Sequence, residues 1–273
     1  MAQVIHDNYY FEDNVNVGID AVVINKLSAG GSAGDLPKWM LRDSSGFIWA
    51  KGRSKDDSFE PEAEVCAYRL ACLFGVPAIP YSMISKAEFS DKPVCVSRDY
   101  SQGLITMSLI KYLLSLGMEE ISVLDGLEKL RLVESVLSEQ AKMLHRSILL
   151  FDYIVGNDDR HLRNFDVRVN KDSSLHSLVE LYDTGAALFS SQSLMLLKQA
   201  CNQRDNYVKA KPYANPQLSQ LELLRSVGCY GLLRAASKVE IYKAINSCFS
   251  GERAKLLGTY VIKNAERLGL ICK

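Results

Sequence analysis

The sequence lacks an excess of either charge. Its 32 lysine and arginine residues balance 32 aspartate and glutamate residues, so the formal net charge is zero. Proteins that bind nucleic acid through its phosphates usually carry a basic excess, and disordered chains combine high net charge with low hydrophobicity. With 48% hydrophobic residues, the composition predicts a folded globular protein, and we expect no direct nucleic-acid partner.

Long apolar runs are also missing. No stretch reaches the roughly 18 to 20 residues that a membrane-spanning helix needs. The most apolar one, residues 147–156, is shorter and contains Asp152. The N-terminus has neither the basic nor the apolar region of a signal peptide. We therefore expect a cytoplasmic protein that does not bind membranes.

The seven cysteines form no C-x-x-C pair, and no histidine lies beside them at zinc-ligand spacing. This pattern excludes the usual zinc and redox motifs. We expect free thiols in a reducing compartment and assign them no chemistry.

Short apolar segments separated by turns occupy the first hundred residues. Strands are predicted over residues 17–25, 39–42, 47–51, 81–84 and 94–97. Asp43–Gly46 is predicted to be a hairpin turn. A helix is predicted from about Pro61 to Phe74, with a stop at Gly75.

After residue 103 the pattern becomes mostly helical. Amphipathic stretches cover residues 122–155, 216–225 and 238–268. The fold class predicted is α+β, with a small β-rich N-lobe over 1–100 and a larger helical C-lobe over 101–273. Ligands favour the cleft between two such lobes.

The most informative segment is Gly156-Asn-Asp-Asp-Arg-His-Leu-Arg-Asn164, followed by Leu181-Tyr-Asp-Thr-Gly185. Asp159 and Asn164 lie five positions apart in a polar loop after an apolar helix, and Asp183 follows in a short apolar strand. The spacing is that of the kinase catalytic loop H-R-D-x-x-x-x-N, and D-x-G is the counterpart of D-F-G. One carboxylate can orient a hydroxyl while an asparagine and a second carboxylate hold magnesium ions.

The upstream half supplies the other parts of such a site. Gly30 and Gly31 follow a predicted strand and allow backbone N–H groups to approach phosphates. Lys51 ends a strand, where its ammonium can contact the α and β phosphates, and Glu64 on the next helix can pair with it. Each feature alone is common, but their order along the chain predicts a kinase.

With these residues the sequence resembles the HipA family of bacterial serine/threonine kinases, which includes toxin kinases of toxin–antitoxin loci. The resemblance covers about residues 28 to 185 and rests on Ser28-Ala-Gly-Gly31 with Pro37-Lys38, Ile48-Trp-Ala-Lys51, Glu64-Val-Cys-Ala-Tyr-Arg-Leu-Ala71, Gly75-Val-Pro77, Val96-Ser-Arg-Asp99, the segment from Gly156 to Asn164, and Tyr182-Asp183.

The resemblance implies a bilobal kinase fold akin to the phosphoinositide-3-kinase branch, with ATP and Mg²⁺ in the cleft. It implies that Asp159 is the catalytic base, that Asn164 and Asp183 bind metal, and that Lys51 contacts phosphate. The backbone from Ser97 to Asp99 would form the hinge that contacts adenine.

The resemblance also implies partners. The substrate would be a protein, and family members are associated with aminoacyl-tRNA synthetases. Full-length members carry an N-terminal subdomain that we do not find here, so the chain resembles the short forms. An antitoxin or a separate subdomain protein is therefore an expected partner.

The glycine-rich loop, residues 28–37, is longer than the usual family pattern. Family members autophosphorylate a serine in this loop as an off-switch. Ser28 fits by its distance to Gly31, and Ser32 is the alternative.

Several residues compete for the predicted roles. Glu60 and Glu62 are alternatives to Glu64 as the partner of Lys51, and the spacing to Ala67 and Leu70 favours Glu64. Asp158 is the alternative to Asp159 as the base. His161 is interpreted as a residue that structures the loop. The roles of Arg160 and Arg163 stay open between phosphate contact and ion pairing.

Three functions fit these residues. The leading hypothesis is an ATP-dependent serine/threonine protein kinase. A small-molecule or lipid kinase is the second, because phosphoinositide kinases share the D-R-H-x-x-N arrangement. A nucleotide-binding pseudokinase is the third, although Lys51, Asp159, Asn164 and Asp183 are all intact.

Overall fold

The computed structural model describes residues 22–27, 36–85, 87, 89–202, 208–229 and 231–272. The candidate loop residues Ser28, Gly30, Gly31 and Ser32 lie outside the described residues.

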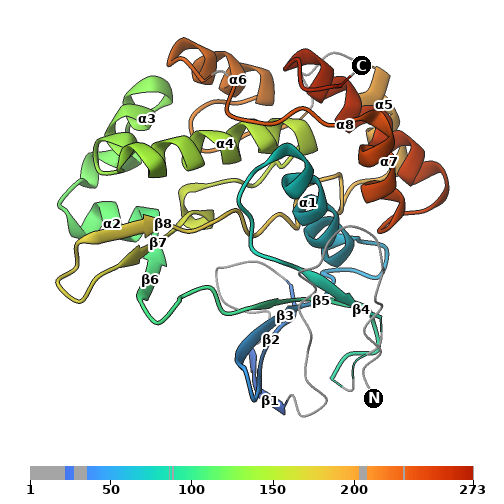
Figure 1. Cartoon of the computed structure of the whole chain (residues 1–273), viewed down its shortest axis with the longest axis horizontal. Coiled ribbons are helices and arrows are strands. Elements are labelled where there is room, and N and C mark those ends of the chain that lie inside the picture. The colour runs from blue at the N-terminus through green and yellow to red at the C-terminus, as the bar shows by residue number, and fades with distance from the viewer. Residues whose placement is uncertain are drawn as a thin grey trace.

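A five-stranded antiparallel sheet forms the first part of the molecule (Figure 1). Its strands are β1 (Val22–Leu27), β2 (Lys38–Asp43), β3 (Gly46–Lys51), β4 (Ser82–Ile84) and β5 (Val94–Arg98), in the order β1-β2-β3-β5-β4. The predicted hairpin is confirmed, since Asp43 lies opposite Gly46 at the β2–β3 turn. Gly46 adopts φ +125°, a value that side chains rarely allow.

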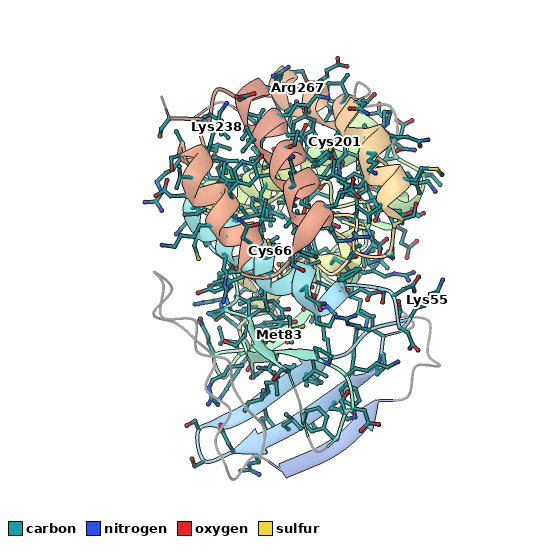
Figure 2. All side chains as sticks on the ribbon, turned by 90° about the vertical axis from the view of Figure 1, so that its right-hand side faces the viewer. Lys55, Cys66, Met83, Cys201, Lys238 and Arg267 are labelled. Carbon is teal, nitrogen blue, oxygen red and sulfur yellow. The ribbon has the colours of Figure 1, made fainter. Side chains whose placement is uncertain are left out.

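Helix α1 (Glu60–Phe74) lies between this sheet and the helices of the second half (Figure 1). It contacts β4 and β5 on one side and helices α4 (Glu139–Val155) and α7 (Lys238–Asn246) on the other. It ends as predicted at Gly75, which takes the left-handed conformation with φ +73°. Figure 2 shows Cys66 of α1 between the helices and the sheet.

The remaining helices are α2 (Leu109–Ser115), α3 (Gly126–Ser135), α5 (Leu194–Asn202), α6 (Gln217–Ser226) and α8 (Gly251–Arg267), with 3₁₀ turns η1 (Glu119–Ser122) and η2 (Leu162–Asn164). Two predicted long helices are therefore interrupted. The predicted helix over residues 122–155 is divided into α3 and α4. Ser138 caps the start of α4, where its side chain accepts a hydrogen bond from the Ala141 amide. Residues 238–268 divide between α7 and α8, after Ser247 ends α7.

The prediction that the chain is mostly helical after residue 103 was wrong in one region. Strands β6 (Ile105–Ser108), β7 (Asp166–Val169) and β8 (Leu175–Leu178) form a second antiparallel sheet in the order β6-β7-β8. Strands of four residues are too short to show a clear period in the sequence. Their pairing holds β7, the strand that begins two residues after Asn164, between β6 and β8.

Buried apolar side chains connect these parts. The largest cluster packs α1 against the helices, and a second lies on the sheet around Trp39, Ile48 and Val96. A third, with Tyr81 and Val179, joins the sheet to the segment before Asp183. None of the helices in the described part of the chain is both long and apolar enough to cross a bilayer.

A buried carboxylate ties α3 to α4. Glu134 accepts from Arg146 Nε at 2.7 Å, and His145 Nδ1 lies 3.8 Å away. Burial alone would raise the pKa of Glu134, but the contacts with Arg146 and His145 outweigh it and lower the pKa to about 2. The ionised carboxylate therefore stabilises the fold above its ordinary pKa of 4.5, and this stabilisation is lost as the pH falls from 4.5 toward 2.

We predict that Glu134→Gln lowers the free energy of unfolding by about 2–3 kcal/mol at pH 7 and by about half of that at pH 3. Urea denaturation at both pH values measures the difference. Glu139→Gln is the control, because that carboxylate is 85% exposed in its pair with Lys142. An equal loss at both pH values for Glu134→Gln would contradict the prediction.

Candidate active site

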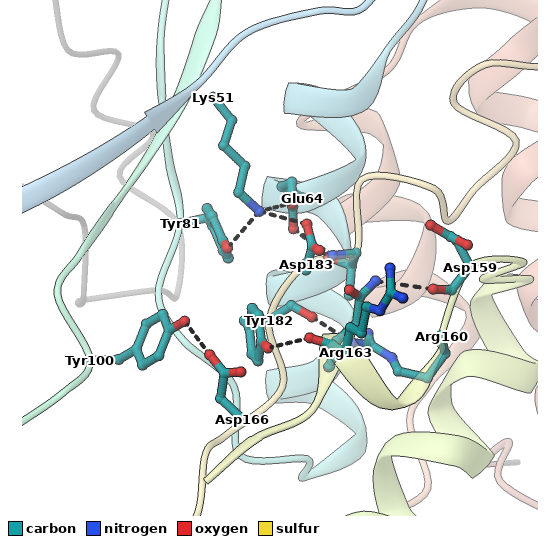
Figure 3. Close-up of polar contacts among 12 residues, drawn as sticks. Lys51, Glu64, Tyr81, Tyr100, Asp159, Arg160, Arg163, Asp166, Tyr182 and Asp183 are labelled. Atoms are coloured by element: carbon teal, nitrogen blue, oxygen red, sulfur yellow. Dashed lines mark hydrogen bonds and ion pairs between the residues drawn. The ribbon is translucent and has the colours of Figure 1, made fainter. Parts of the chain in front are cut away.

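Three charged residues from separate elements meet at one point (Figure 3). Lys51 Nζ, at the end of β3, lies 2.8 Å from Glu64 Oε1 of α1 and 2.8 Å from Asp183 Oδ1. Tyr81 adds its hydroxyl at 3.4 Å and its ring face beneath the ammonium. The structure thus brings together three of the residues singled out in the sequence.

The strand register explains part of this arrangement. Lys51 lies directly opposite Lys38 of β2 and opposite Cys95 of β5. Two lysines in a cross-strand pair repel each other unless an anion lies nearby. Asp183 is such an anion, since both lysines lower the pKa of its carboxyl.

The pKa values show how strongly these charges are coupled. Burial alone would lower the pKa of Lys51, but Asp183 and Glu64 outweigh it and raise the pKa well above its ordinary value. Burial would likewise raise the pKa of Asp183, yet Lys51 holds it well below its usual range. Both residues are therefore charged across the physiological pH range.

Asp183 adopts φ +54°, in the left-handed region that non-glycine residues rarely enter. Its neighbour Thr184 is buried and donates to Glu64 Oε2 at 2.8 Å from both its amide and its hydroxyl. Glu64 therefore uses one oxygen for Lys51 and the other to fix the residue after Asp183. Backbone strain held in this way is typical of functional sites.

The structure also separates the competing acids on α1. Glu60 accepts from the hydroxyls of Ser54 and Ser58, and Glu62 pairs with Arg53. Glu64 is the α1 acid whose carboxylate contacts Lys51.

The loop with Asp159 and Asn164 follows α4, which ends at Val155 as predicted, and Gly156 takes φ +65°. Asn164 Nδ2 donates to the Asp159 carbonyl at 3.0 Å, so the two residues fix one loop turn. The Asp159 carboxylate is turned outward and accepts from Lys211 Nζ at 2.9 Å. His161 lies 3.8 Å from the same carboxylate, beyond hydrogen-bond distance.

Arg160, whose role was left open, is one of the largest fully buried side chains. Its Nε donates to Asp152 Oδ2 of α4 at 2.9 Å, and its Nη1 donates to the carbonyls of Asn164 and Tyr182 at 2.8 Å each. Asn157 completes the network by donating to Asp152 at 2.8 Å. Arg160 therefore forms a buried ion pair, and it joins the loop to the residue before Asp183.

The sequence carries one signal for this network. Asp152 stands alone in an apolar helix, and a buried carboxylate requires a partner. An arginine eight positions later was available to supply it.

The predicted hinge residues lie at the end of β5. Ser97 is buried and pairs with Trp49, and the Asp99 amide donates to the Phe47 carbonyl at 3.0 Å. Beyond them, the Tyr100 ring stacks on Tyr182 with centroids 5.3 Å apart. The strand end is thus placed close to the Asp183 segment.

Asn164 and Asp183 fit a magnesium site in chemical terms. Both offer side-chain oxygens, and the Asp183 carboxylate is 30% exposed. No cluster of three or more His, Cys, Asp or Glu side chains suited to a metal occurs among the described residues. A magnesium ion that arrives with ATP uses one or two protein carboxylates together with phosphates and water, so a larger cluster is not required.

Solved structures share this fold at low sequence identity. The Helicobacter pylori proinflammatory kinase CtkA gives a TM-score of 0.62 at 16% identity, over 86% of this chain and 88% of that chain. HipA of Shewanella oneidensis MR-1, in a toxin–antitoxin complex with HipB and operator DNA, gives 0.51 at 14% identity, over 88% of this chain and 65% of that chain.

Comparison with protein-family models gives no match, and comparison with curated protein sequences gives none either. The likeness therefore lies in the fold. The predicted resemblance to HipA kinases is confirmed at this level, as a mixed α/β fold with small antiparallel sheets and helices.

We predict that Arg160→Met lowers the free energy of unfolding by about 3–5 kcal/mol, because it leaves Asp152 buried without its cation. Urea denaturation followed by circular dichroism measures this. Lys142→Met is the control, since its pair with the 85% exposed Glu139 is worth at most about 1 kcal/mol. Adding Asp152→Asn should recover part of the loss. Equal effects of the two single variants would contradict the prediction.

Proposed function

We propose that this chain is an ATP-dependent serine/threonine protein kinase of the HipA type. The observation that carries the proposal is the contact of Lys51 with both Glu64 and Asp183, at 2.8 Å each and from positions 13 and 132 residues away. A lysine paired with a helix-borne glutamate and placed beside a metal-binding aspartate is the arrangement that protein kinases need. The fold shared with CtkA supports the proposal.

The bound Mg²⁺–ATP complex supplies the γ-phosphoryl group and part of its charge neutralisation. Lys51 would contact the α and β phosphates, and Glu64, 2.8 Å from its ammonium, would hold the lysine in place. Asn164 and Asp183 bind the magnesium ions. Asp159, whose carboxylate is 47% exposed, would accept the proton of the attacking hydroxyl.

The backbone supplies the rest of the nucleotide site in this proposal. In this proposal the amides of Gly30 and Gly31 would contact phosphates, and the backbone from Ser97 to Asp99 would contact adenine. The bilobal, phosphoinositide-3-kinase-like description, with an N-lobe over 1–100 and a C-lobe over 101–273, belongs to the same proposal. It is supported by the position of Lys51 and Asp183 on opposite sides of that boundary.

The proposed partners are an antitoxin or a separate subdomain protein and a protein substrate, with aminoacyl-tRNA synthetases as the candidate class. The HipA structure supports an antitoxin because HipA is found there with HipB. The present chain spans 65% of the HipA chain.

We predict that Asp159→Asn slows phosphoryl transfer by a factor on the order of 10² to 10⁴, because the variant has no base for the hydroxyl proton. Transfer from radiolabelled Mg²⁺–ATP to the protein itself and to lysate proteins measures this. Asp158→Asn is the control, because it removes the neighbouring carboxylate and should keep most of the activity. Equal rates for the two variants would remove Asp159 from its role.

The same assay separates the other two functions. Labelling of phosphoinositide vesicles or sugars, without labelling of proteins, would favour a small-molecule or lipid kinase. ATP binding without transfer to any acceptor would favour a pseudokinase.

We predict that autophosphorylation occurs on Ser28 rather than on Ser32. Mass spectrometry of the peptide that contains both residues, after incubation with Mg²⁺–ATP, should locate the phosphate. Ser28→Ala should abolish this modification and Ser32→Ala should retain it. The opposite pattern would assign the site to Ser32.

A further inference from the structure

The segment between α5 and α6 brings a lysine to the proposed catalytic base. Lys211 Nζ donates to Asp159 Oδ1 at 2.9 Å, from 52 positions away. The two side chains are 49% and 47% exposed. An ion pair this exposed contributes little to stability. Stability therefore does not explain why a lysine is positioned here.

The backbone around Lys211 is fixed to the catalytic loop. On its C-terminal side, the buried side chain of Gln217 donates to the carbonyl of Asn157, within that loop. Tyr213 is also buried, and its hydroxyl lies 2.9 Å from His145 Nε2 of α4. Lys211 is thus presented to Asp159 by backbone that is anchored on both the loop and its supporting helix.

Two other cations of the site, Arg160 and Lys51, are engaged by acids. Arg160 is buried against Asp152 and two carbonyls, and Lys51 contacts Glu64 and Asp183. Among the described residues, Lys211 is the cation within hydrogen-bond distance of the Asp159 carboxylate. An ammonium has three N–H donors, so contact with Asp159 leaves donors for the oxygens of an anion.

We propose that Lys211 binds the γ-phosphoryl group of ATP and holds it beside Asp159 during transfer; this inference rests on the proposed kinase function. The acceptor oxygen forms a bond to the γ-phosphorus while the bond to the β–γ bridging oxygen breaks. ADP leaves with that electron pair, and the hydroxyl proton goes to Asp159. Phosphoryl oxygens that pass close to a carboxylate are repelled by it. The Lys211 ammonium, held beside this carboxylate, would offset the repulsion.

The test compares Lys211→Met with Lys198→Met. Lys198 is a matched control because it is 48% exposed and pairs with Glu252 at 2.7 Å, away from the catalytic loop. Affinities for Mg²⁺–ATP and Mg²⁺–ADP are measured by calorimetry, alongside the rate of phosphoryl transfer. Thermal melting confirms that each variant is folded.

Lys211→Met should weaken ATP binding by about tenfold relative to ADP, the value of one charge-assisted hydrogen bond. It should slow transfer by at least the same factor. Lys198→Met should change neither quantity, and Lys211→Arg should restore part of the preference for ATP.

Equal losses of ATP and ADP affinity, or no change in either, would overturn the role of Lys211 and leave it as a counter-ion of Asp159. A wild-type protein that binds ATP but transfers nothing would refute the kinase function alone, because the ratio of ATP to ADP affinity still tests Lys211. A wild-type protein that binds neither nucleotide would overturn both proposals.

Discussion

The arrangement of the site depends on the buried pair between Arg160 and Asp152. The guanidinium joins α4 to the carbonyls of Asn164 and Tyr182, and so fixes the loop with Asp159 relative to the segment with Asp183. Burying such a pair is costly, and burial raises the pKa of Asp152 even with Arg160 beside it. The geometry it imposes cannot be supplied by apolar packing, because only directed hydrogen bonds hold two backbone carbonyls at one point.

A second constraint joins the sheet to the rest of the molecule. Lys51 at the end of β3 contacts Asp183, which comes from a distant segment. Glu64 of α1 accepts from Lys51 and from the amide of Thr184, the residue after Asp183, so it fixes both sides of this contact. The chain as a whole is neutral, yet this small region contains closely spaced charges of both signs. The proposed nucleotide and magnesium site depends on this local field, which the overall composition does not show.

Much of the fold follows from local pattern. The β2–β3 hairpin, α1 with its stop at Gly75, and α4 with its end before Asn157 each carry period or turn signals within a few residues. The β6-β7-β8 sheet was missed because its strands are short and its pairing is not local. The role of Arg160 stayed open because no period distinguishes a buried arginine from an exposed one.

The motifs of the sequence indicate the order of the proposed phosphoryl-transfer residues. Their spacing reflects the chemistry expected of Lys51, Glu64, Asp159, Asn164 and Asp183. The sequence did not indicate that Arg160 supports the loop from inside or that Lys211 reaches Asp159, and both came from the packed structure. These are contacts between segments far apart in the chain. Which residues meet in such contacts depends on how the helices and sheets pack, and the spacing of residues along the chain does not predict this packing.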